Sequence, residues 1–116
     1  MSDNKKTIEW YMDGFNKSDH AQILSCLTDD VVWEMPGFFH HVGKEDFDKE
    51  IENDAFEGRP IITVTRMTEE EGVVIAEGTV LTKPKGGNVT PMVFCDVFEM
   101  RGGKISKLIG YIAQVK

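Results

Sequence analysis

The first apolar residues of the chain recur at the spacing of a helix. Those at positions i, i+3, i+4 and i+7 are Ile8, Tyr11, Met12 and Phe15. Residues with this spacing share one face of an amphipathic helix, so we predict a first helix over about residues 3–15. A turn follows, and Ser18 has the side chain of an N-cap for a second helix.

A third helix is predicted from the charged stretch that begins at Gly43. Phe47, Ile51 and Ala55 recur there at i, i+4 and i+8. This spacing gives a largely charged helix one apolar face, which we expect to point toward the core.

A short strand is predicted over residues 31–35, where Val31, Trp33 and Met35 share one face. Pro36 and Gly37 end it. We interpret the next segment, residues 37–42, as a loop. Its ring-bearing side chains are Phe38, Phe39, His40 and His41. Because a surface connection is seldom so apolar, we expect this loop to fold over a cavity or an interface.

The second half of the chain alternates in the manner of β-strands. We predict strands over residues 61–68 and 73–82, and a β-hairpin over residues 91–115 that turns at Arg101, Gly102, Gly103 and Lys104. These elements indicate an α+β domain whose three helices pack on one side of a curved antiparallel sheet. Residues 1–116 then form a single domain.

Asp96 is the one carboxylate on an otherwise apolar face of the first hairpin strand. Successive side chains of a strand point to opposite sides, and its neighbours on the same side are Met92, Phe94, Phe98 and Met100. Loss of water disfavours the charged form of a carboxyl group and raises its pKa. Asp96 therefore either donates a hydrogen bond or a proton near neutral pH, or serves only as a structural hydrogen-bonding group.

The composition disfavours several classes of partner. The formal net charge is −7 and the basic residues are scattered, so we expect neither nucleic acid nor a membrane surface as a partner. Without a long apolar run or a signal peptide, the sequence predicts a cytoplasmic protein. Cys26 and Cys95 lack metal-binding or redox spacing, so we expect core thiols and no metal.

Three short motifs, together with the first helix, carry a resemblance to a known family. They are L-T-D-D-V-V-W-E-M-P-G at residues 27–37, G-K-E-D-F at residues 43–47 and F-E-M-R-G-G-K-I at residues 98–105. In this order they resemble the SnoaL-like branch of the nuclear transport factor 2-like superfamily, which includes ketosteroid isomerase and limonene epoxide hydrolase relatives. The resemblance implies a cone-shaped, cystatin-like roll in which the sheet and helices enclose an apolar pocket. It also implies a homodimer through the outer face of the sheet.

The resemblance to ketosteroid isomerases gives Asp96 a chemical role. It places Asp96 where those enzymes keep an aspartate protonated as part of an oxyanion hole. They also use a carboxylate base within an E-D-P motif, but the matching stretch here is Glu34-Met35-Pro36. Met35 cannot abstract a proton. Either His40 or His41 takes the place of the base, because histidine titrates near neutral pH, or both are loop histidines at the surface or bonded to backbone.

Two kinds of function remain open at this point. One is a cofactor-independent isomerase, cyclase or hydrolase for a small hydrophobic metabolite, with Asp96 as acid or oxyanion-hole donor and His40 or His41 as base. The other is a non-catalytic module that binds an apolar molecule or serves as a dimeric scaffold. We expect no cofactor in either case. The residues expected to line the pocket are Tyr11, Phe15, Trp33, Met35, Phe38, Phe39, Phe47, Phe94, Phe98 and Tyr111.

Overall fold

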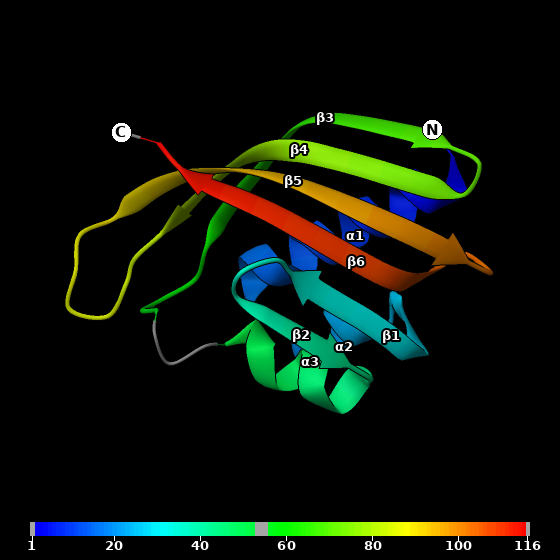
Figure 1. Cartoon of the computed structure of the whole chain (residues 1–116), viewed down its shortest axis with the longest axis horizontal. Helices are drawn as coiled ribbons and strands as arrows, with labels where there is room; N and C mark the ends of the chain where they lie inside the picture. The colour runs from blue at the N-terminus through cyan, green and yellow to red at the C-terminus, as the bar shows by residue number, and fades with distance from the viewer. Residues whose placement is uncertain (1, 53–55, 116) are drawn as a thin grey trace.

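The computed structural model describes residues 2–52 and 56–115, which form three helices and six strands (Figure 1). The helices are α1 (Asp3–Lys17), α2 (His20–Leu24) and α3 (Lys44–Ile51). The strands are β1 (Leu27–Met35), β2 (Phe39–Val42), β3 (Ile61–Glu70), β4 (Val73–Thr82), β5 (Thr90–Arg101) and β6 (Lys104–Gln114). Ala55, predicted on the third helix, lies outside the described residues.

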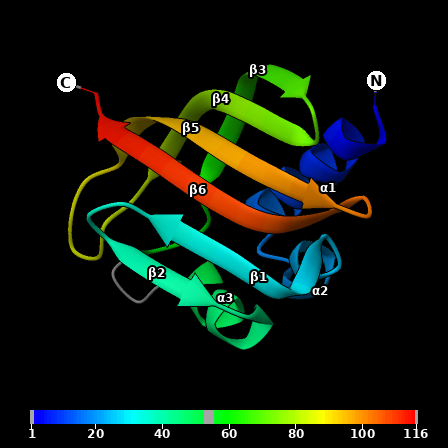
Figure 2. The same cartoon turned by 45° about the vertical axis from the view of Figure 1, so that its right-hand side comes forward.

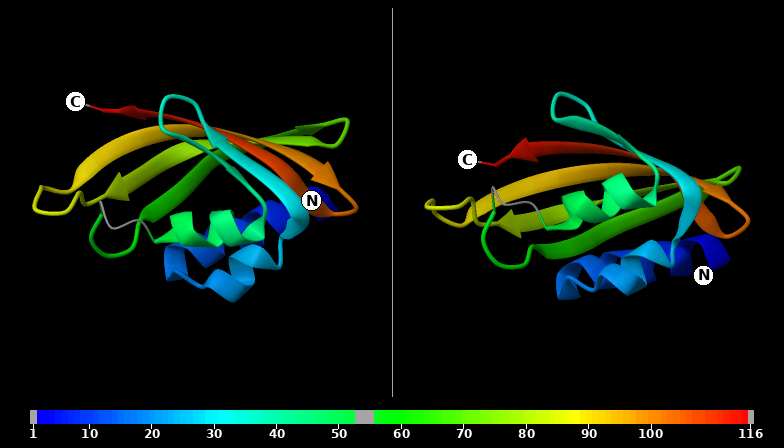
Figure 3. Two further views of the ribbon diagram at one scale, coloured as in Figure 1. Left: turned by 60° about the horizontal axis from the view of Figure 1, so that its bottom comes forward. Right: turned by 90° about the horizontal axis from the view of Figure 1, so that it is seen from below.

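All six strands belong to one curved sheet with the order β2-β1-β6-β5-β4-β3 (Figure 2). The views in Figure 3 show the three helices together on its concave side. The predicted α+β architecture is therefore confirmed. One detail differs, because β1 pairs with β6 in parallel while the other neighbouring strands are antiparallel.

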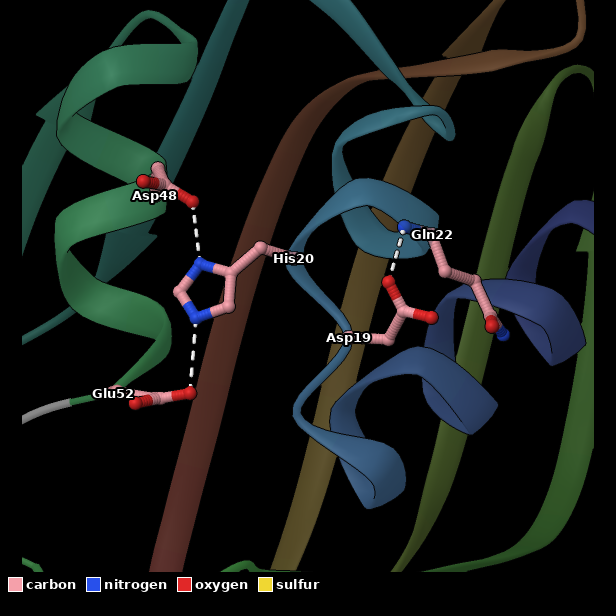
Figure 4. Close-up of polar contacts among 5 residues, drawn as sticks. All are labelled: Asp19, His20, Gln22, Asp48 and Glu52. Atoms are coloured by element: carbon pink, nitrogen blue, oxygen red, sulfur yellow. Dashed lines mark hydrogen bonds and ion pairs between the residues drawn. The ribbon is translucent and has the colours of Figure 1, made fainter.

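The junction between α1 and α2 depends on Asp19 and not on the predicted cap, Ser18. The Oδ1 atom of Asp19 accepts a hydrogen bond from the backbone N–H of Gln22 at 3.0 Å (Figure 4). The backbone of Asp19 is extended (φ −94°, ψ 96°), as an N-cap requires. Ser18 instead ends α1 in the left-handed conformation, with φ 53°.

His20 links α2 to α3. Its Nδ1 atom lies 2.5 Å from Oδ1 of Asp48, and its Nε2 atom lies 3.0 Å from Oε1 of Glu52 (Figure 4). The hydrogen bonds to Asp48 first and then to Glu52 raise the pKa of His20 above its usual value. These two contacts of the His20 imidazole tie the two short helices together.

The segment predicted to be a loop contains β2, an edge strand that forms a hairpin with β1. Glu34 pairs with His40, and the backbone N–H of Phe38 donates to the carbonyl of Met35 at 2.8 Å to close the turn. β1 also begins at Leu27, four residues before the predicted strand. A four-residue strand is too short to show a period in its sequence, which explains why the pattern did not indicate β2.

The core lies between the helices and the concave face of the sheet. Its fully enclosed large side chains are Phe47, Phe98, Ile8, Ile23, Leu27, Ile105, Leu108, Val31 and Val74. The aromatic rings of Phe47 and Trp33 stack with centroids 4.3 Å apart, which fixes α3 against β1. None of the helices in the described part of the chain is long and apolar enough to cross a membrane.

Candidate functional site

An inner pocket of about 120 Å³ lies between α1 and the concave side of the sheet. Its lining residues are Tyr11, Met12, Phe15, Trp33, Met35, Ile62, Val80, Phe94, Asp96, Leu108 and Ile112. Most of these side chains are apolar. Among the described lining residues, Asp96 supplies the only carboxyl group and Tyr11 the only hydroxyl group.

Asp96 lies in the middle of β5, between two small residues of the neighbouring strands. It pairs with Ala76 of β4 and with Gly110 of β6. The absence of a side chain at Gly110 makes room for the carboxyl group, because a Cβ atom there would lie 3.1 Å from Oδ1 of Asp96. Burial raises the pKa of Asp96 to about 7. None of the residues that the structure describes donates a hydrogen bond to this carboxyl group.

Tyr11 places a second polar group in the same pocket. α1 turns its ring into the core, where it makes edge-to-face contacts with Phe98 at 5.5 Å and with Phe15 at 5.1 Å between ring centroids. Burial, and then the negative charge that Asp96 carries when ionised, hold the pKa of Tyr11 well above its ordinary value. The Tyr11 phenol therefore stays protonated and can only donate or accept a neutral hydrogen bond.

The wall of the pocket combines predicted residues with others that the sequence analysis did not select. Phe15, Trp33, Met35 and Phe94 line it, as do Tyr11 and Asp96. The additional residues are Met12, Ile62, Val80, Leu108 and Ile112. Strand alternation carried a signal for two of them, since Leu108 and Ile112 stand two residues to either side of Gly110 and therefore face the same side of β6.

Four of the predicted phenylalanines lie away from the pocket lining. Phe47 and Phe98 are fully buried behind the wall, where they contact Trp33 and Tyr11. Phe39 packs edge-on against the ring of Trp33 at 5.0 Å, on the hairpin side. Phe38 is 68% exposed in the turn between β1 and β2. The aromatic character of a residue therefore does not predict whether its side chain lines the pocket or packs in the core behind the lining.

A family model described as SnoaL-like domain matches residues 8–108 of the chain. The protein belongs to the SnoaL-like family. A search of curated protein sequences finds no match.

Solved structures share the fold of this SnoaL-like protein at low sequence identity. An NTF2-like protein of unknown function from Burkholderia pseudomallei has a TM-score of 0.89 at 16% identity, covering 97% of this chain and 92% of that one. TerC, co-crystallised with polyporic acid, has a TM-score of 0.85 at 22% identity, covering 94% and 90%. An LEH-like epoxide hydrolase from M. tuberculosis has a TM-score of 0.83 at 19% identity, covering 96% and 83%. These similarities establish the fold.

His40 and His41, the two histidines expected to supply a base, are not among the residues that line the pocket. His40 is exposed on the edge strand β2. The Nε2 atom of His41 lies 2.8 Å from Oε1 of Glu50, and its ring stacks on Phe39 at 4.6 Å. His41 pairs with Trp33 across the β1–β2 hairpin and therefore faces the same side of the sheet, but the contact with Glu50 of α3 engages its imidazole there.

Tyr111 lies on the opposite face of the sheet from Asp96. It pairs with Cys95, the residue next to Asp96, and alternation therefore turns it outward. Its side chain is 50% exposed and contributes to a groove on the outer face. The expectation that Tyr111 lines the inner pocket is therefore wrong, because its pairing with Cys95 turns the side chain to the outer face.

The outer groove has a volume of about 490 Å³ and is open to solvent. Its lining residues are Thr65, Glu77, Gly78, Thr79, Val93, Phe94, Cys95, Tyr111, Ile112 and Ala113. Val93 is 42% exposed beside Tyr111, and the thiol of Cys95 is partly exposed although we expected a core position. Glu77 forms an ion pair with Arg66 at the margin of this groove.

Within residues 2–52 and 56–115, no three histidine, cysteine or acidic side chains are arranged to hold a metal ion. The polar side-chain groups of the described pocket lining are the carboxyl group of Asp96, the phenol of Tyr11 and the indole N–H of Trp33.

Proposed function

We propose that this SnoaL-like protein binds a small apolar molecule through one hydrogen-bond-accepting oxygen, with Tyr11 and Asp96 as donors in the inner pocket. The observation that carries the proposal is the carboxyl group of Asp96, which faces an apolar cavity without a protein partner among the described residues and has a pKa of about 7. Below that pH the group is neutral and carries a proton to donate.

The two donors suit a hydrogen-bond acceptor such as a carbonyl oxygen. The Tyr11 phenol stays protonated because its pKa is raised, and neutral Asp96 adds a second O–H donor. A ligand oxygen that accepts from both groups takes the place of water in a largely apolar site, where hydrogen bonds are stronger than in bulk solvent. TerC, which shares the fold, was co-crystallised with polyporic acid, and this supports a small-molecule site.

Acid catalysis is the second candidate, because a carboxyl group with a pKa near 7 can protonate a substrate oxygen at physiological pH. An isomerase or cyclase also needs a base within reach of the substrate. Met35 lies in the lining at the place where the base is expected, and His41 is engaged by Glu50. We therefore favour ligand binding over turnover.

Variants of Asp96 test the binding proposal with 2-cyclohexenone as the probe and ligand-observed NMR as the readout. Asp96→Leu removes the donor, so we expect about tenfold weaker binding, the equivalent of one hydrogen bond to a buried group. Asp96→Asn keeps an N–H donor at every pH and should bind above pH 7, where the wild-type protein weakens. Equal binding by the wild type and Asp96→Leu would overturn the proposal.

We further propose that the outer groove is covered by a second copy of the chain. Val93, Tyr111 and Ile75 expose apolar surface on one sheet face, which is unusual for an isolated monomer. In a twofold dimer both copies contribute the same patch to the interface, so the apolar surface of one copy packs against the apolar surface of the other. The proposal agrees with the dimer that the family resemblance implies.

A further inference from the structure

Four aromatic side chains line the inner pocket together with Asp96. α1 supplies Tyr11 and Phe15, β1 supplies Trp33, and β5 supplies Phe94. The ring planes of Tyr11 and Phe15 meet at 64° with centroids 5.1 Å apart, and those of Phe15 and Trp33 meet at 76° with centroids 6.0 Å apart. Rings that meet this steeply turn their faces in different directions, as the walls of an aromatic cage do.

The inner pocket carries a negative charge whenever Asp96 is ionised. Its described lining contains no lysine, arginine or histidine. The strands on either side of Asp96 set Ala76 and Gly110 beside it. The titratable groups that feel its charge are the phenol of Tyr11, on α1, and the thiol of Cys95, on the other face of β5, and neither forms a cation. Within the described part of the pocket, the carboxylate therefore has no positively charged partner.

A small ammonium ion matches this combination of groups. Its N–H groups donate to the carboxylate of Asp96 and to the phenol oxygen of Tyr11, which accepts as well as donates. The ring faces of Phe15 and Trp33 attract a cation, and this attraction offsets part of the cost of removing the ion from water. The formal net charge of −7 also raises the concentration of cations near the chain.

We infer that the inner pocket also binds the ammonium ion of a small apolar amine, with ionised Asp96 as its counter-ion. Tyr11, Phe15 and Trp33 form the aromatic cage around the cation. This ligand class goes beyond the proposed function, because it uses the charged form of Asp96, whereas an oxygen acceptor uses the neutral form. The two classes of ligand therefore depend on pH in opposite directions.

Ligand-observed NMR with cyclohexylamine tests the inference, and cyclohexanol is the matched probe, with the same ring and no charge. Because the pKa of Asp96 is about 7, its ionised fraction rises about tenfold between pH 6 and pH 8, while an alkylammonium ion stays protonated. The wild-type protein should therefore bind cyclohexylamine about tenfold more tightly at pH 8 than at pH 6. Cyclohexanol should bind no more tightly at pH 8 than at pH 6.

Two variants separate the counter-ion from the cage. Asp96→Asn keeps the shape of the side chain but does not ionise, so at pH 8 it should bind cyclohexylamine roughly tenfold more weakly than the wild type and should lose the pH dependence. Phe15→Leu keeps an apolar side chain and removes a ring, so it should weaken cyclohexylamine about threefold and leave cyclohexanol unchanged.

Equal binding of cyclohexylamine at both pH values, or by the wild type and Asp96→Asn at pH 8, would overturn the inference. Titration with 2-cyclohexenone at pH 6 distinguishes this failure from that of the proposed function. If the enone binds in a manner that depends on Asp96 and the amine does not bind, the inference is overturned and the proposed function stands. If the amine binds as expected and the enone does not, the inference stands alone.

Discussion

A methyl group at Gly110 would lie 3.1 Å from Oδ1 of Asp96, because the two residues face each other across the β5–β6 ladder. The obstacles it would meet are side chains, which can shift. We expect Gly110→Ala to destabilise the fold by about 1–2 kcal/mol and to abolish binding of a carbonyl ligand. Urea denaturation and the NMR titration with 2-cyclohexenone measure the two effects. Unchanged binding by a folded Gly110→Ala variant would contradict the placement of the ligand oxygen.

Gly78 provides the contrasting case. A Cβ atom there would lie 1.9 Å from the backbone carbonyl oxygen of Thr63, next to the irregularity between Val64 and Arg66 in the β3–β4 pairing. Backbone cannot move aside as a side chain does, so Gly78→Ala should cost about 3 kcal/mol or more. The two glycine variants, compared in one denaturation series, are expected to differ clearly in midpoint. A Gly78→Ala variant as stable as Gly110→Ala would show that the β3 backbone can shift.

The raised pKa of Asp96 predicts how stability depends on pH. Its ordinary value is 3.8 and its folded value is about 7, so the folded state favours the neutral form. The stability contributed by the neutral group is complete below about pH 4 and is lost as the pH rises through 7. Three pKa units correspond to about 4 kcal/mol.

Asp96→Asn isolates this contribution because it removes the titration and keeps the shape. The free energy of unfolding of the wild type relative to Asp96→Asn should fall by up to about 4 kcal/mol between pH 4 and pH 8. Guanidinium denaturation at several pH values gives this difference. A constant difference across the range would mean that Asp96 is not desolvated.

The contacts of His20 with Asp48 and Glu52 also predict that the stability of the fold falls as the pH rises, as it does for Asp96, although the titrating group here is a base. Asp48 and Glu52 raise the pKa of His20 above its ordinary value of 6.5, so the contribution is complete below about pH 6 and is lost as the pH rises through the raised pKa. All three side chains are more than a third exposed, and solvent screening limits the effect to about 0.5–1 kcal/mol.

His20→Gln should therefore lose stability at pH 5.5 and little at pH 8.5, as measured by urea denaturation. Glu45→Gln is the control, because Glu45 is an exposed residue of α3, the helix that carries Asp48, and does not contact His20. If both variants lose the same stability at both pH values, the contacts of His20 with Asp48 and Glu52 do not make the free energy of unfolding depend on pH.

The outer groove predicts the oligomeric state. We expect light scattering to give twice the chain mass of 13.1 kDa for the wild type. Tyr111→Glu should give the monomer mass, because a charge buried against its own copy is strongly unfavourable. Val42→Glu, on the exposed edge strand β2, serves as the control and should remain dimeric. A monomeric wild type would exclude the second copy as the cover of this face.

The sequence predicted most of the sheet because long strands show their alternation. Asp96 was selected for the same reason, since it breaks the apolar face that includes Phe94 and Phe98. The inner position of Tyr11 followed from helical spacing. These inferences rest on local periodicity, which a single sequence contains.

Other features depended on pairing between distant segments, which local patterns do not record. The outward position of Tyr111 follows from its partner Cys95 in the ladder. The contact of His41 with Glu50 joins β2 to α3 and removes the imidazole from the pocket. Phe47 and Phe98 differ from the wall residues only in the layer that they occupy, and composition does not distinguish these layers.

The parallel contact between β1 and β6 has a consequence for biosynthesis. Leu27 pairs with Ile105, so an early strand finds its sheet partner only after most of the intervening sequence has been made. Contacts between such distant segments form slowly. Until β6 has been synthesised, the edge of β1 that pairs with it has no partner strand, and apolar side chains such as Trp33 lack part of their packing. Chaperones would protect the chain during this interval.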